Sequence, residues 1–119
     1  MCRLGKRLRP GGKAEAEVAK HPCVYILASQ RNGTLYTGVT GNIANRVMLH
    51  KQGKGSAFTR KYGVTRLVWC EFHEDFGFAI EREKRIKNWR RAWKLELIEA
   101  TNPEWEDLYE TIQMWAPMD

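Results

Sequence analysis

The sequence predicts an α+β domain in which a small central antiparallel sheet of about three strands is flanked by helices. Three short runs rich in β-branched and aromatic residues, at 24–27, 35–40 and 65–72, are typical of strands. Apolar residues recur at helical spacing in the segments that follow them, chiefly 43–50 and 76–89. The 119 residues, 43% of them hydrophobic, suit one small domain with a modest core.

The first two strands are predicted to pair as a hairpin. Asn32-Gly33 separates the runs Val24–Leu27 and Leu35–Thr40, and it is typical of a type I′ turn, which needs positive φ at both central positions. Because successive side chains of a strand point to opposite faces, Tyr25 and Ile26 lie on opposite sides of the sheet. Both faces are therefore expected to be covered.

A helix is expected to follow the hairpin, with Asn42 as its N-cap and an apolar stripe between Ile43 and Leu49. Arg46 and His50 lie four residues apart, so both side chains project from the same side of this helix. We therefore expect them to converge with the two tyrosines of the hairpin, where the hairpin meets the helix.

The segment 51–62 is predicted to be a flexible basic loop, because it is rich in glycine, small residues and cations. Its cations, hydroxyl groups and backbone N–H groups suit phosphate oxygens, and Phe58 or Tyr62 can stack on a base. The alternative is a solvated loop without a ligand. The candidate nucleic-acid ligands are Lys51, Lys54, Ser56, Thr59, Arg60 and Lys61.

The remaining elements are a third strand and two more helices. Thr65–Phe72 is rich in strand-forming residues, and a helix over Phe76–Trp89 is expected to start after Asp75 as its N-cap. Asn102-Pro103 is typical of an N-cap followed by a proline in the first helical position. A last helix is therefore expected to begin there and to fray over 116–119.

The helix expected over Phe76–Trp89 contains an unusual carboxylate. Glu83 lies on the inward stripe of the helix, whereas Glu81 faces solvent. The other members of the stripe are Ala79, Ile80, Ile86 and either Trp89 or Trp93. A carboxylate on an apolar face is costly unless it is paired or bound to a metal. Glu83 is therefore a candidate metal ligand, and the alternative is a structural salt bridge.

The charge of the chain is distributed unevenly. Between Cys23 and Cys70 there are seven Lys or Arg residues and no Asp or Glu. From Glu96 to Asp119 there are seven acidic residues and no Lys or Arg. The basic segment 23–70 and the acidic C-terminal segment fit a protein with one face that binds a polyanion. The alternative is that these charges only face solvent.

The composition favours a cytoplasmic protein without a membrane partner. No run approaches the roughly 18–20 apolar residues of a membrane span, and the N-terminus lacks the apolar region of a secretory signal. The three cysteines, Cys2, Cys23 and Cys70, are odd in number and lack paired metal-ligand spacing, which fits a reducing compartment. Residues 1–21 carry six Lys or Arg side chains and are expected to form a disordered basic arm.

These residues, in this order, resemble the GIY-YIG nuclease superfamily. Cys23-Val24-Tyr25 stands where the family has Gly-Ile-Tyr, and Tyr36-Thr37-Gly38 stands where it has Tyr-Ile-Gly. Arg46 matches the catalytic arginine of the family. The resemblance covers roughly residues 22–110 and is greatest to the small single-domain endonucleases of the superfamily. The nuclease domain of excinucleases is also similar.

The resemblance implies a GIY-YIG-like nuclease domain over 22–115, with a C-terminal helix. Such an endonuclease hydrolyses phosphodiester bonds in DNA, in repair or processing, with RNA as an alternative substrate. The family also implies single-metal hydrolysis, in which Glu83 binds Mg²⁺ or Mn²⁺ and Arg46 contacts the phosphate. Tyr36 is the favoured base with Tyr25 as the alternative, and His50 can share that duty near neutral pH.

Three features depart from the family pattern. Val39 stands where many members have a lysine, which removes a cation that would help to ionise Tyr36. Cys23 replaces the first motif glycine. The asparagine that often follows the glutamate has no counterpart, because Asn88 is too near and Asn102 is predicted to be a cap. The alternative function is a non-catalytic nucleic-acid-binding module that retains the nuclease fold, and a weaker alternative is a structural or protein-interaction domain.

Overall fold

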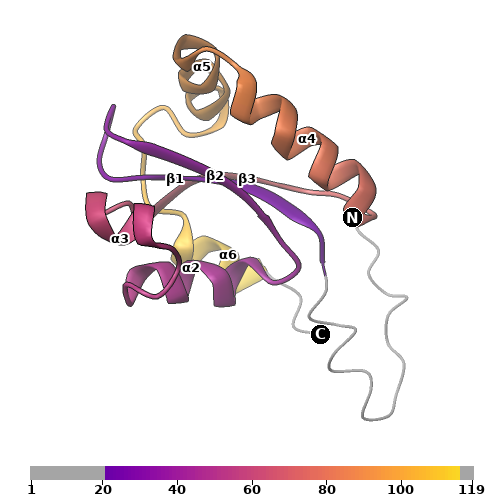
Figure 1. Cartoon of the computed structure of the whole chain (residues 1–119), viewed down its shortest axis with the longest axis horizontal. Helices are drawn as coiled ribbons and strands as arrows, with labels where there is room; N and C mark the ends of the chain where they lie inside the picture. Colours follow the sequence, from indigo (N-terminus) through magenta and orange to yellow (C-terminus); the bar gives the residue numbers. More distant parts are fainter. Residues whose placement is uncertain (1–20, 116–119) are drawn as a thin grey trace.

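The computed structural model describes residues 21–115 of the chain. Its centre is a three-stranded antiparallel sheet in the order β2-β1-β3, formed by β1 (Cys23–Ala28), β2 (Leu35–Thr40) and β3 (Arg66–Phe72). Helices cover both faces of the sheet (Figure 1), which confirms the predicted α+β class. The arm predicted for 1–21, apart from His21, and the fraying predicted for 116–119 lie outside the described residues.

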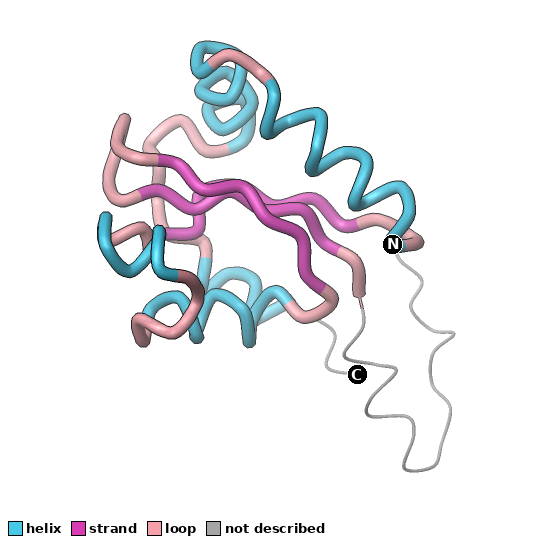
Figure 2. The backbone as a smooth tube through the Cα atoms, in the orientation of Figure 1, coloured by secondary structure: helices cyan, strands magenta, loops and turns pink. Residues whose placement is uncertain are grey.

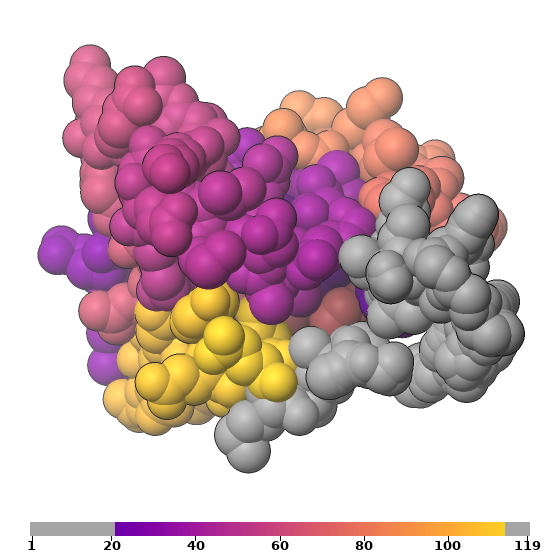
Figure 3. Space-filling model, turned by 90° about the horizontal axis from the view of Figure 1, so that it is seen from below, coloured from indigo at the N-terminus to yellow at the C-terminus, as the bar shows by residue number. Residues whose placement is uncertain are grey.

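The helices of the described part of the chain form two layers around this sheet (Figure 2). Their bounds are α2 (Ile43–Lys51), α3 (Ala57–Tyr62), α4 (Phe76–Asn88), α5 (Arg91–Thr101) and α6 (Tyr109–Trp115). α4 and α5 lie on one side of the sheet, and the other three lie on the opposite side. There α2 and α6 are in contact, side by side (Figure 3). None of these helices is long and apolar enough to span a membrane.

The alternation of β1 divides the core into two halves, as the sequence predicts. Val24 and Ile26 pack on the face beneath α4, with Ile86 among their neighbours. Tyr25 and Leu27 pack on the opposite face with the apolar residues of α2 and α6. Every residue of β1 is buried, and a fully buried aliphatic side chain contributes roughly 1.5–3 kcal/mol. The central strand is therefore the main anchor of both layers.

The hairpin turn differs from the predicted type I′ turn. The loop between β1 and β2 spans residues 29–34, and within it the N–H of Gly33 donates to the carbonyl of Gln30 at 2.9 Å. Asn32 has a φ of 61°, but Gly33 does not have a positive φ. The prediction is wrong because the loop is longer: only one residue enters the left-handed region, whereas a two-residue type I′ turn needs two.

The third strand contains a β-bulge opposite the centre of β1. Ile26 pairs with Trp69, but Leu27 pairs with Leu67, so Val68 is the extra residue. The irregularity allows the consecutive residues Val68 and Trp69 both to join the half of the core beneath α4.

Asn102 holds the segment 102–108 against this bulge. Its Nδ2 donates to the carbonyl of Val68 at 3.1 Å and to that of Glu106 at 2.9 Å, and its Oδ1 accepts from the N–H of Glu106 at 2.9 Å. Asn102 follows the end of α5, and the next helix begins only at Tyr109. The predicted N-cap at Asn102 is therefore wrong, because its side chain closes a turn and binds β3 instead.

Asn102→Ala is expected to lower the free energy of unfolding by about 2–3 kcal/mol. The side chain is buried, and its removal leaves the polar groups of Val68 and Glu106 without their partner. Urea denaturation followed by circular dichroism measures the loss. Asn88→Ala, at an exposed position at the end of α4, is the control and should change stability by less than about 0.5 kcal/mol. Equal losses in the two variants would contradict this account.

Candidate active site

Two tyrosines lie on the face of the sheet that α2 covers. Tyr25 of β1 is buried and Tyr36 of β2 is half-buried, and their ring centroids are 6.3 Å apart. Gly38 lies opposite Tyr25 in the register of the two strands. A Cβ at Gly38 would come within 2.6 Å of the Tyr25 hydroxyl oxygen. The glycine of the second motif thus makes room for the tyrosine of the first.

His50 joins these two rings from the last turn of α2. Its Nε2 is 3.3 Å from the hydroxyl oxygen of Tyr25, and its ring centroid is 5.4 Å from that of Tyr36. Its other nitrogen, Nδ1, is 3.0 Å from the hydroxyl oxygen of Thr59. A Cβ at Gly55 would collide with the imidazole. We call Tyr25, Tyr36 and His50 the ring cluster.

Thr59 and Ser56 support the ring cluster from α3. The hydroxyl of Ser56 accepts from the N–H of Thr59 at 3.1 Å and caps the helix, and the two hydroxyl oxygens are 3.0 Å apart. The predicted flexible loop is wrong over Ala57–Tyr62, because this cap starts a short helix there. Thr59 is only 1% exposed, so the structure corrects its predicted contact with phosphate. Its hydroxyl holds His50 instead.

Burial sets the protonation states of Tyr25 and His50. It raises the pKa of Tyr25 above the ordinary value of a phenol; the neighbouring Tyr36 raises it further, and the Arg46 guanidinium lowers it. Burial also lowers the pKa of His50 from 6.5, and the charge of Arg46 lowers it further. Both groups are therefore neutral at neutral pH. A neutral imidazole donates at one nitrogen and accepts at the other, so it can link Tyr25 to Thr59.

Arg46 lies one turn before His50 on α2 and carries an orphaned donor. Its Nε is buried and has no hydrogen-bond partner among residues 21–115. Its charge is close enough to shift the pKa values of Tyr25 and His50. Buried donors are nearly always paired, and a guanidinium matches phosphate oxygens in shape and charge. The side chain is therefore suited to an anion beside the ring cluster.

Glu83 belongs to α4, which covers the other face of the sheet, and its side chain is buried. It is 8% exposed, between the buried residues Ala79 and Ile86, as its helical position predicts. Its Oε2 is 2.7 Å from Nζ of Lys87, which is the salt bridge that the sequence left as the alternative. Ile80 is 40% exposed, so its predicted place on the inward stripe is wrong. The structure does not bring Glu83 into the ring cluster, since the sheet lies between them.

Val39 also lies on the α4 side. Its register partner is Val24, and it packs against the core beneath α4. Tyr36 points to the opposite face, because it pairs with Leu27. Val39 and Tyr36 therefore lie on opposite faces of the sheet. A longer side chain at position 39 would begin on the face that carries Glu83.

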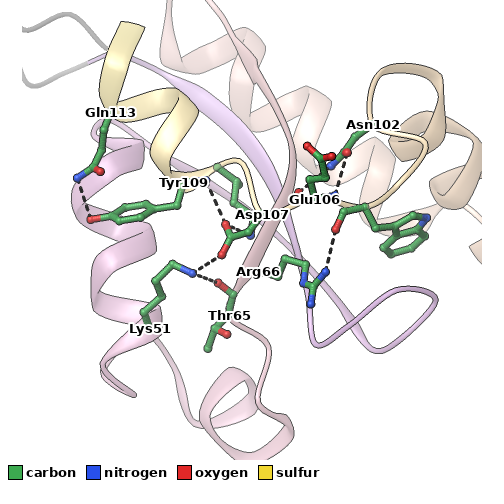
Figure 4. Close-up of polar contacts among 10 residues, drawn as sticks. Lys51, Thr65, Arg66, Asn102, Glu106, Asp107, Tyr109 and Gln113 are labelled. Carbon is green, nitrogen blue, oxygen red and sulfur yellow. Dashed lines mark hydrogen bonds and ion pairs between the residues drawn. The ribbon is translucent and has the colours of Figure 1, made fainter.

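Lys51 has a structural partner rather than a free charge (Figure 4). Its Nζ donates to the carbonyl of Thr65 at 3.1 Å, pairs with Oδ2 of Asp107 at 2.5 Å and lies 5.4 Å from the ring centroid of Tyr109. These contacts tie α2 to the segment before α6, and the contact of Lys51 with phosphate stays a prediction. All four predicted cations of this segment are exposed, and Lys54 and Lys61 lack such an ion pair among the described residues, as does Arg60.

Comparison with known proteins identifies the family. Residues 21–96 match the model of the GIY-YIG catalytic domain. The chain belongs to the GIY-YIG family. It is 37% identical over 91 residues to a UPF0213 protein of Clostridium perfringens, covering 76% of this chain and 97% of that protein. It is 42% identical over 82 residues to a UPF0213 protein of Syntrophus aciditrophicus, covering 68% and 92%.

A solved structure is also similar to this GIY-YIG chain. The solution NMR structure of the UPF0213 protein BH0048 from Bacillus halodurans is 31% identical, covers 73% of this chain and 92% of that one, and gives a TM-score of 0.47. The family assignment confirms the resemblance inferred from the motifs. Membership of this nuclease superfamily implies a nucleic-acid substrate, and GIY-YIG nucleases generally use divalent metals.

The donor set of this GIY-YIG chain fits a cation held by one carboxylate. Mg²⁺ and Mn²⁺ prefer oxygen ligands, and Mg²⁺ keeps several of its waters when a protein binds it. The described residues contain no group of three or more His, Cys, Asp or Glu able to hold a metal, so a cage of protein ligands does not fit. Glu83 provides one buried carboxylate, which a cation would share with Lys87, and water would complete the shell.

Sequence reasoning missed two supports of the ring cluster. Gly55 is one of several glycines in its segment, and no spacing rule marks it as the residue beside His50. The hydroxyl of Thr59 is evident from its residue type, but its burial depends on α3, which the glycine-rich composition conceals. In both cases the signal is a contact between segments, which no local pattern contains.

His50 is expected to make the fold less stable as the pH falls. Because burial lowers the pKa of His50 in the folded protein from 6.5, the unfolded chain binds the proton first on acidification. The stability that this group contributes is therefore complete above pH 6.5 and is lost progressively below it. Urea denaturation from about pH 8 to about pH 5 should show a shallower decline for His50→Gln than for the wild type. Parallel curves would refute this role.

Gly38→Ala is expected to destabilise the fold by about 1–3 kcal/mol, because the new methyl group displaces the buried Tyr25 ring. Thermal unfolding monitored by near-ultraviolet circular dichroism reports both the stability and the packing of the tyrosine. Gly77→Ala is the control, because its Cβ meets only one side-chain oxygen of Asp75, at 3.2 Å, and no buried ring. A Gly38→Ala protein as stable as this control would show that the close approach is unimportant.

Proposed function

We propose that this chain is a divalent-metal-dependent endonuclease that hydrolyses phosphodiester bonds in DNA, in repair or processing. The observation that carries the proposal is the buried, unpartnered Nε of Arg46 beside the ring cluster. Arg46 is half-buried overall, and its guanidinium can stabilise the charge that develops on a phosphate during phosphoryl transfer. The family supports a nucleic-acid substrate.

The ring cluster supplies candidates for positioning and deprotonating the attacking water. Tyr25 is buried with a raised pKa, which makes it a poor base and suits it to orienting His50. Tyr36 is less buried and lies against the same imidazole, so we assign it the role of base or water-positioning group. His50 is held neutral, Thr59 fixes its orientation, and we assign it a share in the base function through its contact with the Tyr25 hydroxyl.

Glu83 is the proposed ligand of Mg²⁺ or Mn²⁺. When bound, such a cation polarises the phosphate and stabilises the leaving oxygen. Lys87 holds one oxygen of the carboxylate and orients the side chain on its helix. Glu83 and Arg46 lie on opposite sides of the sheet, so a substrate that meets both must pass the edge formed by β2.

A second candidate function is a non-catalytic nucleic-acid-binding module. The observation that favours it is the Glu83–Lys87 ion pair, because the pair can satisfy the buried carboxylate without a metal. The basic, acid-free stretch from Cys23 to Cys70 would serve binding in either case.

Glu83→Gln is expected to reduce metal-dependent cleavage by at least about 100-fold while DNA binding is retained, because the amide removes the anionic oxygen ligand. Glu81→Gln is the matched control: it lies on the same helix, is exposed and pairs with Arg85. Cleavage should be measured on branched, nicked, single-stranded and duplex DNA and on RNA, with Mg²⁺, Mn²⁺ or chelator.

The pattern across the variants separates the two functions. Metal-dependent cleavage by the wild type and Glu81→Gln, but not by Glu83→Gln, supports the endonuclease. Equal cleavage by all three proteins rejects Glu83 as the metal ligand. No cleavage by the wild type on any substrate, with binding intact, supports the binding module.

A further inference from the structure

Two aromatic rings on α3 lie at the surface next to the ring cluster. Phe58 and Tyr62 are 44% and 47% exposed, and their ring centroids are 4.9 Å apart. The ring centroid of Phe58 also lies 6.3 Å from that of Tyr36, with an angle of 30° between the ring planes. We call Phe58 and Tyr62 the aromatic platform. It continues the ring cluster outward from the buried Tyr25 to solvent.

The fold of α3 does not account for this exposure. Thr59 is the buried residue of this short helix, and its hydroxyl anchors the helix to His50. The neighbouring aromatic side chains contribute little to the core, yet they place two large rings in contact with water. Adjacent exposed rings beside a candidate active site are a typical feature of a binding surface.

The charges around the platform select the kind of partner. Nζ of Lys61 lies 5.4 Å from the ring centroid of Tyr62, and Lys54 and Arg60 are exposed on the same segment. No Asp or Glu occurs between Cys23 and Cys70. Exposed aromatic rings interleaved with cations match a single-stranded nucleic acid, whose bases stack on the rings while the phosphates meet the cations.

We propose that the aromatic platform stacks an unpaired nucleobase next to the phosphodiester held by Arg46. This inference rests on the proposed function and names its substrate class: a strand with at least one unpaired nucleotide beside the bond that is cut. A base inside a duplex has both faces covered by its neighbours, so it must leave the stack before it can cover Phe58. Phe58 and Tyr62 are thus specificity-determining residues.

The test compares binding of a fluorescently labelled single strand with binding of the same sequence in a blunt duplex. Fluorescence anisotropy is recorded with chelator present, so that no cleavage occurs. Phe58→Leu keeps apolar contact with Tyr36 but removes the aromatic face; it should weaken single-strand binding about tenfold and duplex binding less than about twofold. Phe58→Trp should restore the affinity. Phe78→Leu, at a 65% exposed ring near the start of α4, is the matched control.

Abasic substitution identifies the stacked base directly. Replacing the nucleotides of the single strand one at a time should weaken binding by the wild type at one or two adjacent positions. Phe58→Leu should be insensitive to the same substitutions. Equal weakening on single strand and duplex, an effect equal to that of Phe78→Leu, or equal sensitivity of wild type and Phe58→Leu to the abasic positions would each overturn the proposal.

The result is independent of catalysis. If Phe58→Leu weakens single-strand binding but the wild type cleaves no substrate, the platform is supported and the nuclease is rejected. Metal-dependent cleavage that Glu83→Gln abolishes, with no effect of Phe58→Leu on binding or on substrate preference, would support the nuclease and reject the platform.

Discussion

The contact between the Tyr25 hydroxyl and the His50 imidazole is the constraint around which three elements are fixed. Tyr25 comes from the central strand, His50 from α2, and Thr59, on the far side of the imidazole, from α3. Each of these polar groups is buried, so each depends on the next for its hydrogen bonds. Gly38 and Gly55 are required because the rings occupy the space that a Cβ would fill.

Much of this arrangement follows from local sequence patterns. The alternation of β1, the caps at Asn42 and Asp75, and the buried position of Glu83 were predictable, because each depends on neighbours within about one helical turn or two strand positions. The order of the motif tyrosines and Arg46 was sufficient to indicate the family.

What could not be predicted depends on partners that are distant in the sequence. Asn102 has the local signature of a cap, but it binds the carbonyl of Val68 on β3. Lys51 looks like a free cation of a basic loop, but Asp107 and the carbonyl of Thr65 hold it. A buried donor or acceptor pairs with whichever partner the fold brings near it. Residue type alone does not reveal which neighbour that is.

The segment that closes on β3 also affects how this protein meets other copies of itself. β3 is an edge strand, yet near its bulge the N–H of Leu67 donates to Asp107 Oδ1 and the carbonyl of Leu67 accepts from the N–H of Leu108. An open edge offers free backbone groups as a template for aggregation. With these groups occupied and the strand bent, an added strand cannot pair with β3 at Leu67, so intermolecular sheet growth is hindered at this end of the edge.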